Sequence, residues 1–152
     1  MYVRNAGCSQ QMDVVFVLDI SGSVQEKYDK AMMFARNVTY GLDIDSGNVK
    51  VGAVSYSSSA LGQFYLRDYR RREAAIAALR FYNPGGSTNT ASALDEVRNT
   101  HLTSSYGARS GVRKVNYFFF GFYLVRLYVF RVLSRSTDSQ KAKGFLDTIL
   151  AV

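Results

Sequence analysis

The chain has 152 residues, 47% of them hydrophobic, with a single proline and no internal repeat, which suits one domain with its own core and argues against a disordered or repeat protein. Its net charge of +7 is uneven, because residues 1–66 carry five basic and six acidic side chains and residues 67–152 carry fourteen basic and six acidic ones. A basic surface favours acidic partners such as sulfated glycans, anionic membranes or nucleic acid, although charge runs are more often solvated faces with no ligand.

The first element in the chain is a continuous apolar run at residues 14–18, which predicts a parallel strand buried on both faces. Asp19, Ser21 and Ser23 follow it directly in the pattern Asp-x-Ser-x-Ser. One carboxylate and two hydroxyls can hold a hard cation, and open α/β sheets bind ligands at the carboxyl ends of their strands. The other interpretation is that these side chains bond backbone groups of the turn and cap the next helix.

Helical and strand patterns alternate after this motif. Apolar residues at helical spacing predict a helix over residues 25–40. Residues 49–56 predict a second buried strand, and residues 60–66 alternate like a short third strand beside it. Residues 69–79 predict a short helix with a basic start that opposes the helix dipole. This alternation predicts an α/β three-layer sandwich with a mostly parallel sheet.

The polar face of the first predicted helix carries an N-glycosylation sequon, Asn37-Val38-Thr39. A sequon of this kind has meaning only if the chain is secreted.

A loop rich in helix breakers occupies residues 83–90, with Pro84 and the pair Gly85-Gly86. Apolar residues at helical spacing resume at Thr90, so a helix is predicted directly behind the loop. The loop thus presents the pattern Gly-Gly-x-Thr-x-Thr, whose first threonine is Thr88, before a helix carrying Ala-Leu.

The two motifs, in this order and approximate spacing, resemble the von Willebrand factor type A (VWFA) family, which includes integrin I domains, matrilins and many extracellular matrix proteins. Further agreement comes from the strand Val-Gly-Ala-Val-Ser-Tyr-Ser, the helix Arg-Arg-Glu-Ala-Ala-Ile-Ala-Ala-Leu and the Arg-Lys-Val that precedes the next strand. The resemblance covers residues 8–116. It implies a doubly wound, Rossmann-like α/β/α fold, with residues 1–11 as an N-terminal lead and residues 12–152 as a single domain that diverges from residue 117.

The resemblance also implies a metal-ion-dependent adhesion site (MIDAS) for Mg²⁺ or Mn²⁺. It assigns Ser21 and Ser23 as direct ligands, Asp19 as a ligand or water-mediated anchor, and Thr88 as the hydroxyl from the second loop. A carboxylate of a protein partner then fills the vacant coordination position, so that the metal bridges the interface.

The sequence departs from the family after Lys114. Type A domains continue their fourth strand into Thr-Asp-Gly, whose aspartate supplies a third loop to the metal site. Counting from Arg-Lys-Val puts Gly121 at that position, and no acidic residue occurs between Glu96 and Asp138. We therefore expect an incomplete site with weak or lost metal binding, and an atypical or truncated C-terminal part.

The aromatic stretch at residues 117–133 allows three interpretations. A buried strand followed by a second strand is favoured. A membrane-spanning helix is disfavoured, since Arg126 and Arg131 would each cost about 2.5–3.5 kcal/mol near its centre. A divergent, alternatively spliced or mispredicted chain end is the third. Residues 137–150 predict a last helix with an apolar face.

The function implied by the resemblance is a non-enzymatic, secreted adhesion or protein-interaction module of extracellular-matrix type, with a matrix or collagen-like partner. Acidic glycans are further candidate partners, and nucleic acid is not expected. The alternative is metal-independent binding of a polyanion by the basic residues Arg67, Arg70, Arg71 and Arg72.

No nucleophile elbow, P-loop or histidine pair occurs, and the single histidine, His101, falls on an apolar helix face, where a structural role is expected.

Cys8 is the only cysteine, so no intrachain disulfide can form. Extracellular members of the family commonly pair a cysteine before the first strand with one after the last helix; Cys8 lacks that partner and is expected to be free or bonded to another chain. Residues 1–7 lack the apolar stretch of a secretory signal. The chain is therefore expected to be a fragment, an internal module, or a product that does not enter the secretory route by itself.

Overall fold

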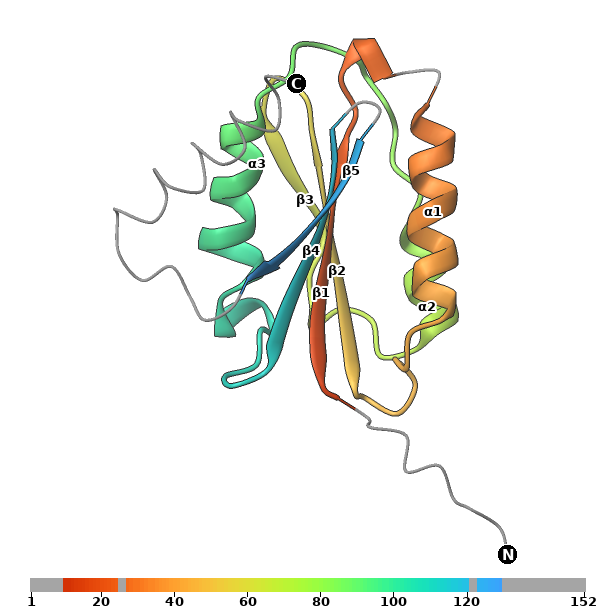
Figure 1. The fold of residues 1–152 in the computed structure, drawn as a ribbon, viewed down its shortest axis with the longest axis vertical. Coiled ribbons are helices and arrows are strands. Elements are labelled where there is room, and N and C mark those ends of the chain that lie inside the picture. The colour runs from red at the N-terminus through yellow and green to blue at the C-terminus, as the bar shows by residue number, and fades with distance from the viewer. Residues whose placement is uncertain (1–9, 25–26, 121–122, 130–152) are drawn as a thin grey trace, which may run out of the picture.

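The described part of the chain forms a five-stranded sheet with helices on both faces (Figure 1). The computed structural model describes residues 10–24, 27–120 and 123–129. The strands are β1 (Met12–Asp19), β2 (Val49–Tyr56), β3 (Ala60–Phe64), β4 (Arg113–Phe120) and β5 (Tyr123–Val129). They lie in the order β3-β2-β1-β4-β5; β1 is parallel to β2 and β4, and the outer strands β3 and β5 are antiparallel to their neighbours.

The helices divide between the two faces of the sheet. They are the 3₁₀ turn η1 (Gly22–Val24), α1 (Tyr28–Tyr40), α2 (Arg72–Ala78), α3 (Thr90–Glu96), the π-helical turn η2 (Val97–His101) and the 3₁₀ turn η3 (Ser104–Tyr106). Figure 1 shows α1 and α2 on one face and α3 on the other. The predicted three-layer, doubly wound α/β fold is confirmed, with parallel pairing at its centre and antiparallel pairing at both edges.

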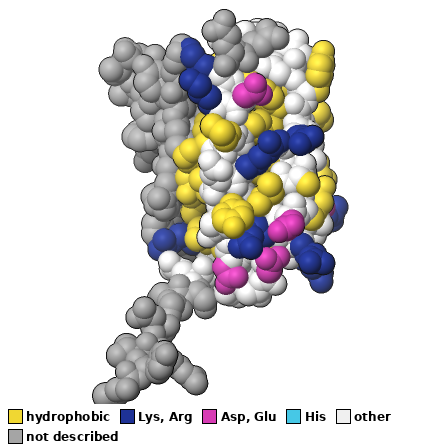
Figure 2. All heavy atoms as spheres, turned by 90° about the vertical axis from the view of Figure 1, so that its right-hand side faces the viewer, with side chains coloured by type: hydrophobic (Ala, Val, Ile, Leu, Met, Phe, Trp, Pro, Cys, Tyr) yellow, Lys and Arg dark blue, Asp and Glu magenta, His cyan; other side chains and the backbone are white. Residues whose placement is uncertain are grey.

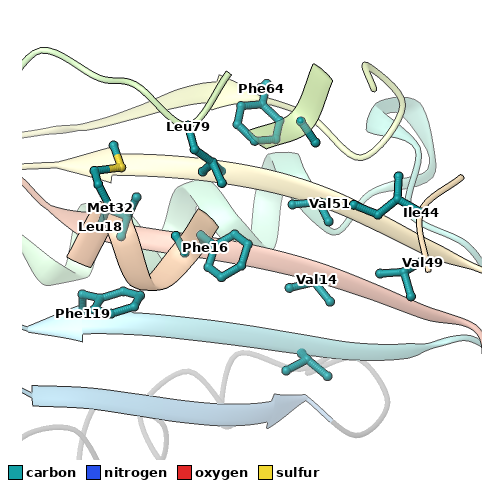
Figure 3. Packing of buried hydrophobic residues seen from close by; sticks show 14 residues of the cluster. Val14, Phe16, Leu18, Met32, Ile44, Val49, Val51, Phe64, Leu79 and Phe119 are labelled. Carbon is teal, nitrogen blue, oxygen red and sulfur yellow. The ribbon is translucent and has the colours of Figure 1, made fainter. Parts of the chain in front are cut away.

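The core is built around β1, whose apolar run is continuous because both of its faces are covered. Val14, Phe16 and Leu18 point toward α1 and α2 in the cluster of Figure 3, and all three are fully buried. Val15 and Val17 point the other way and pack with residues of α3 in a second cluster. The register of β1 with β2 and β4 sets which residues of the three strands lie side by side at the carboxyl end of β1.

The start of α2 differs from the prediction. The sequence pattern places the helix at residues 69–79, but Arg71 is still extended, with φ −119° and ψ 132°, and the helix begins at Arg72. The backbone N–H of Arg72 donates to Asp45 Oδ1 at 2.9 Å, and the Arg72 Nε lies 4.0 Å from Asp45 Oδ2. A carboxylate from a distant loop thus adds to the favourable charge of Glu73 in the first turn of the helix.

The aromatic stretch forms strands where it is described. Residues 117–120 belong to β4, and β5 pairs with β4 in antiparallel register from Phe120↔Tyr123 to Lys114↔Val129. The preferred prediction of two successive strands is therefore confirmed. None of the helices in the described part of the chain has the length and apolar content that a bilayer crossing requires. The predicted last helix at residues 137–150, and Cys8, lie outside the described residues.

The amino-terminal edge of the sheet is closed by a buried carboxylate. Asp13 is fully buried and accepts hydrogen bonds from the backbone N–H and the Nε of Arg109, both at 2.8 Å, and from Lys114 Nζ at 2.7 Å. Arg109 also donates to the carbonyl oxygens of Met12 and Asn48, at 2.8 and 3.0 Å. This cluster ties β1, β4 and the loop before β2 together.

We predict that Asp13→Asn destabilises the domain by about 3 kcal/mol, because it leaves two largely buried cations without their anion. Urea unfolding followed by circular dichroism measures the loss. Asp95→Asn is the matched control, since Asp95 pairs with Arg98 on the surface at 3.6 Å and such pairs contribute about 0.2–1 kcal/mol. Equal losses in the two variants would contradict the assignment.

Candidate functional site

The first motif follows β1 at the carboxyl edge of the sheet. Asp19 is the last residue of the strand and is 6% exposed, and its Oδ1 accepts a hydrogen bond from the backbone N–H of Ser21 at 2.8 Å. Ser21 is fully buried, Ser23 is exposed, and their hydroxyl oxygens lie 3.3 Å apart. The hydrogen bond between Asp19 and a backbone group of the turn, which the alternative interpretation of this motif predicted, is therefore present. A cap for the following helix is not seen, because the N-cap of α1 is Lys27, whose side chain makes no capping hydrogen bond.

The second motif lies against the first. Gly22 N–H donates to the carbonyl oxygen of Gly86 at 3.0 Å, and Figure 1 shows the loop between α2 and α3 passing across the sheet edge beside η1. Gly85 and Gly86 have φ of +73° and +108°, which side chains rarely tolerate. A Cβ on Gly85 would lie 3.6 Å from the Cα of Gly22, an ordinary van der Waals distance. The paired glycines are therefore required by the left-handed backbone of the second loop, and not by a lack of space against Gly22.

The turn between β2 and β3 anchors the second loop. Ser87 donates through its N–H and its hydroxyl to Ser58 Oγ, at 3.3 and 3.0 Å, and the N–H of Asn89 donates to the carbonyl oxygen of Ser57 at 2.7 Å. Thr88 stands between these anchored residues, exposed, with no hydrogen bond to any part of the chain that the structure describes. Its hydroxyl is therefore available to a ligand.

Tyr56 is a residue of this edge that the sequence analysis missed. It ends β2 and pairs directly with Asp19, and its hydroxyl donates to the carbonyl oxygen of Phe119 at 3.1 Å. Burial raises the pKa of the Tyr56 hydroxyl far above its usual value; the charge of Asp19 raises it further, and a hydrogen bond with Thr90 lowers it. Residues 49–56 were predicted as a strand, but its register with β1, which puts Tyr56 opposite Asp19, comes only from the structure.

The donor set fits a hard cation. Two oxygens bound side by side to an octahedral Mg²⁺ lie about 3.0 Å apart, close to the separation of the Ser21 and Ser23 hydroxyl oxygens. Within the described residues, no group of three or more His, Cys, Asp or Glu side chains is placed to hold a metal. A cation at this edge would therefore depend on hydroxyls, with Asp19 as the one carboxylate of the two motif loops.

The third loop of the expected site follows β4. Leu18 pairs with Phe119, so the chain reaches the same sheet edge two residues before Gly121. Gly121 itself lies outside the described residues. β5 begins at Tyr123 and runs back beside β4, so only residues 121 and 122 connect the two strands.

The four candidate arginines have different surroundings. Arg67 lies 4.0 Å from Asp68 and over the ring of Tyr106, and Arg72 is held by Asp45. Arg70 and Arg71 are exposed and form no ion pair within the described part of the chain. Of the four candidate arginines, Arg70 and Arg71 are therefore the two whose positive charge is available to a ligand.

His101 is buried, and its Nε2 lies 3.2 Å from the Ala53 carbonyl oxygen and 3.1 Å from that of Phe64. Ala53 and Phe64 are paired with each other, next to the irregularity in the β2–β3 pairing. Burial lowers the pKa of the imidazole, and the charge of Glu96, whose Oε1 is 3.6 Å from Nδ1, opposes this shift without reversing it. A neutral ring that donates from Nε2 satisfies both carbonyls, which is a structural role.

Comparison with protein-family models gives a match to the von Willebrand factor type A domain over residues 13–121. Integrin alpha-1 of Gallus gallus is 36% identical over 110 residues, which are 71% of this chain and 38% of that protein. Collagen alpha-5(VI) chain of Homo sapiens is 40% identical over 103 residues, 64% of this chain and 4% of that protein. The chain therefore spans well under half of these relatives.

Among solved structures, the fold resembles that of proximal thread matrix protein 1 from the mussel byssus. The TM-score is 0.65 at 20% identity, over 72% of this chain and 30% of the other. A further structure of that protein has a zinc-occupied MIDAS motif and gives a TM-score of 0.61 over 69% of this chain and 29% of the other. At these identities the likeness shows the fold alone.

The lowered pKa of His101 predicts that the domain loses stability as the pH falls below about 6.5. The unfolded histidine then binds a proton that the folded one excludes, so the free energy of unfolding falls by up to about 1.4 kcal/mol per pH unit. Urea unfolding between about pH 7.5 and pH 5.5 measures this slope, which His101→Asn should flatten. An NMR titration of the wild-type ring gives the same pKa directly. A ring pKa above 6.5 would contradict the assignment.

Proposed function

The chain belongs to the von Willebrand factor type A domain family, and on that premise we propose that it is a non-enzymatic adhesion module that binds a protein partner through a divalent cation. The observation that carries this proposal is the contact between the two motif loops, where Gly22 N–H donates to the Gly86 carbonyl at 3.0 Å. This contact brings the segments bearing Asp19 and Thr88 to one sheet edge.

Four side chains would hold the cation, Mg²⁺ or Mn²⁺: Asp19, Ser21, Ser23 and Thr88. The Ser21 N–H orients the Asp19 carboxylate, and burial holds the Ser21 side chain in place. Two of the four proposed ligands are therefore already positioned before a cation binds. Ser23 and Thr88 are exposed at the rim, where a partner would dock. The cation, when bound, supplies an open coordination position that accepts a carboxylate oxygen.

A single carboxylate makes this a weaker site than one with two, because Mg²⁺ gives up its water reluctantly. A partner carboxylate would supply the second negative charge. Cation and partner would therefore raise each other's affinity, and the coupling is reciprocal. Metal binding by the isolated domain is expected to be weak, and adhesion to depend on both together.

The proposed partner is an extracellular matrix or collagen-like protein that presents an acidic side chain. Support comes from the relatives, an integrin and a collagen chain, and the corresponding location is extracellular. Because the chain spans only part of these proteins, the partner is proposed for this domain by itself.

The second candidate function is binding of a sulfated glycan or another polyanion without metal. Its support is the exposed, unpaired state of Arg70 and Arg71 within the described part of the chain. Arg67 and Arg72 are less suitable, since each already has an acidic neighbour.

We predict that Thr88→Ala weakens Mn²⁺ binding about tenfold or more, the scale of a lost contact at a metal site. It should leave the metal-free domain as stable as wild type within about 0.5 kcal/mol, because Thr88 is exposed and unbonded. The measurement is the rise of the unfolding midpoint with added Mn²⁺, which reports affinity. Ser104→Ala, at another exposed hydroxyl, is the control. Equal Mn²⁺ responses in the wild type, Thr88→Ala and Asp19→Ala would reject the site.

Partner binding separates the two functions. Metal-bridged adhesion should be lost in EDTA and should persist in the double variant Arg70→Ala/Arg71→Ala. Polyanion binding should ignore EDTA, weaken steeply with salt and be lost in the double variant. Binding to immobilised collagen-like peptide and to heparin measures both, with Arg98→Ala as a control for a change of charge alone. Adhesion that survives EDTA but not the double variant would overturn the first proposal in favour of the second.

A further inference from the structure

We propose that Asn37 is an N-glycosylation acceptor and that its glycan is attached before α1 folds. Asn37-Val38-Thr39 is the only Asn-x-Ser/Thr triplet in the sequence. The inference rests on one part of the proposed function, passage through the secretory route, and not on the cation or the partner.

Asn37 lies on the outward face of α1, and its side chain is exposed and makes no hydrogen bond to the described part of the chain. Its neighbours on that face are Met33 and Tyr40, four residues before and three after, and they are 58% and 68% exposed. Arg72 lies over the Tyr40 ring, 5.1 Å from its centroid, and still leaves most of the side chain open. Figure 2 shows hydrophobic side chains on this face of the molecule. A glycan on Asn37 would cover two large apolar groups that face water.

Thr39 determines when the glycan can be attached. Its side chain is fully buried, and its hydroxyl donates to the Ala35 carbonyl oxygen at 2.7 Å inside α1. Two residues along an α-helix correspond to a rotation of about 200° around its axis, which puts the two side chains on nearly opposite sides. The Asn37 amide therefore faces solvent, and the Thr39 hydroxyl faces the core. An enzyme that must bind both groups at once can do so only while this segment is unfolded.

The transfer requires an oligosaccharide donor linked to a polyprenyl diphosphate lipid, and an oligosaccharyltransferase. The Asn37 amide nitrogen Nδ2 forms a bond to C1 of the first sugar. The bond between C1 and the diphosphate oxygen breaks, and the lipid diphosphate leaves with the electron pair. The amide nitrogen loses one proton to a base of the enzyme, so no oxidant or reductant is needed.

The position of Asn37 keeps the glycan away from the candidate cation site. Asn37 is nine residues beyond Tyr28, which is about 14 Å along the helix axis. Tyr28 begins α1 at the end nearest η1, where the two motif loops meet (Figure 1). The glycan would therefore cover the flank of the domain and leave the carboxyl edge of the sheet open.

The first test is expression of the full chain behind an added secretory leader in eukaryotic cells. We expect peptide-N-glycosidase to lower the apparent mass of the wild type by one glycan. Asn37→Gln should migrate at the deglycosylated position, and Thr39→Ser, which keeps the sequon, should still shift. Both the medium and the cell lysate are examined, so that poor secretion does not hide the result. An unshifted wild type in both fractions would overturn the proposal.

The second test concerns timing and uses purified oligosaccharyltransferase with the lipid-linked donor. We expect transfer to the urea-unfolded chain, diluted directly into the reaction, and none to the chain folded beforehand. Equal transfer to both would overturn the requirement for an unfolded segment. Neither readout depends on Mn²⁺ or on a partner, so loss of the adhesion function and loss of this modification are distinguishable.

Discussion

Parallel pairing of β1 with a strand on each side is the constraint on which the rest of the structure depends. It aligns the carboxyl end of β1 with the ends of β2 and β4, so that Asp19 lies opposite Tyr56 and Leu18 opposite Phe119. The turn after β2 then holds the loop that carries Thr88. The candidate site is thus a consequence of strand register, and the hydrogen bond between Gly22 and Gly86 brings the two loops together.

The two carboxylates of β1 show how one strand serves two purposes. Asp13, at the amino edge, is buried against Arg109 and Lys114, so its charge is balanced by the protein itself. Asp19, at the carboxyl edge, accepts a hydrogen bond from the Ser21 backbone N–H and has no cationic partner in the described part of the chain. Removing a buried charge that its neighbours balance destabilises the fold, whereas a nearly buried charge without a cation is suited to receive one from solution.

Much of this arrangement followed from sequence, because strong local signals coincided with the fold. The buried strand of residues 14–18 and the glycine-rich loop of residues 83–90 were both predicted from local patterns, whereas their meeting at one edge was implied only by the family resemblance. The start of α2 was wrong because Asp45, distant in sequence, caps it. Tyr56 was missed because its role depends on strand register. The outcome at Gly121 stays a prediction, since that residue lies outside the described part of the chain.

The central claim is that the two motif loops hold a divalent cation, and paramagnetic broadening by Mn²⁺ tests it most directly. In amide spectra of the isotopically labelled domain, sub-stoichiometric Mn²⁺ should broaden Gly22 and Gly86 first and leave Gly111, which precedes β4 at the opposite edge, unchanged. Broadening that is uniform, or that begins at Asp45 beside the start of α2, would contradict the account.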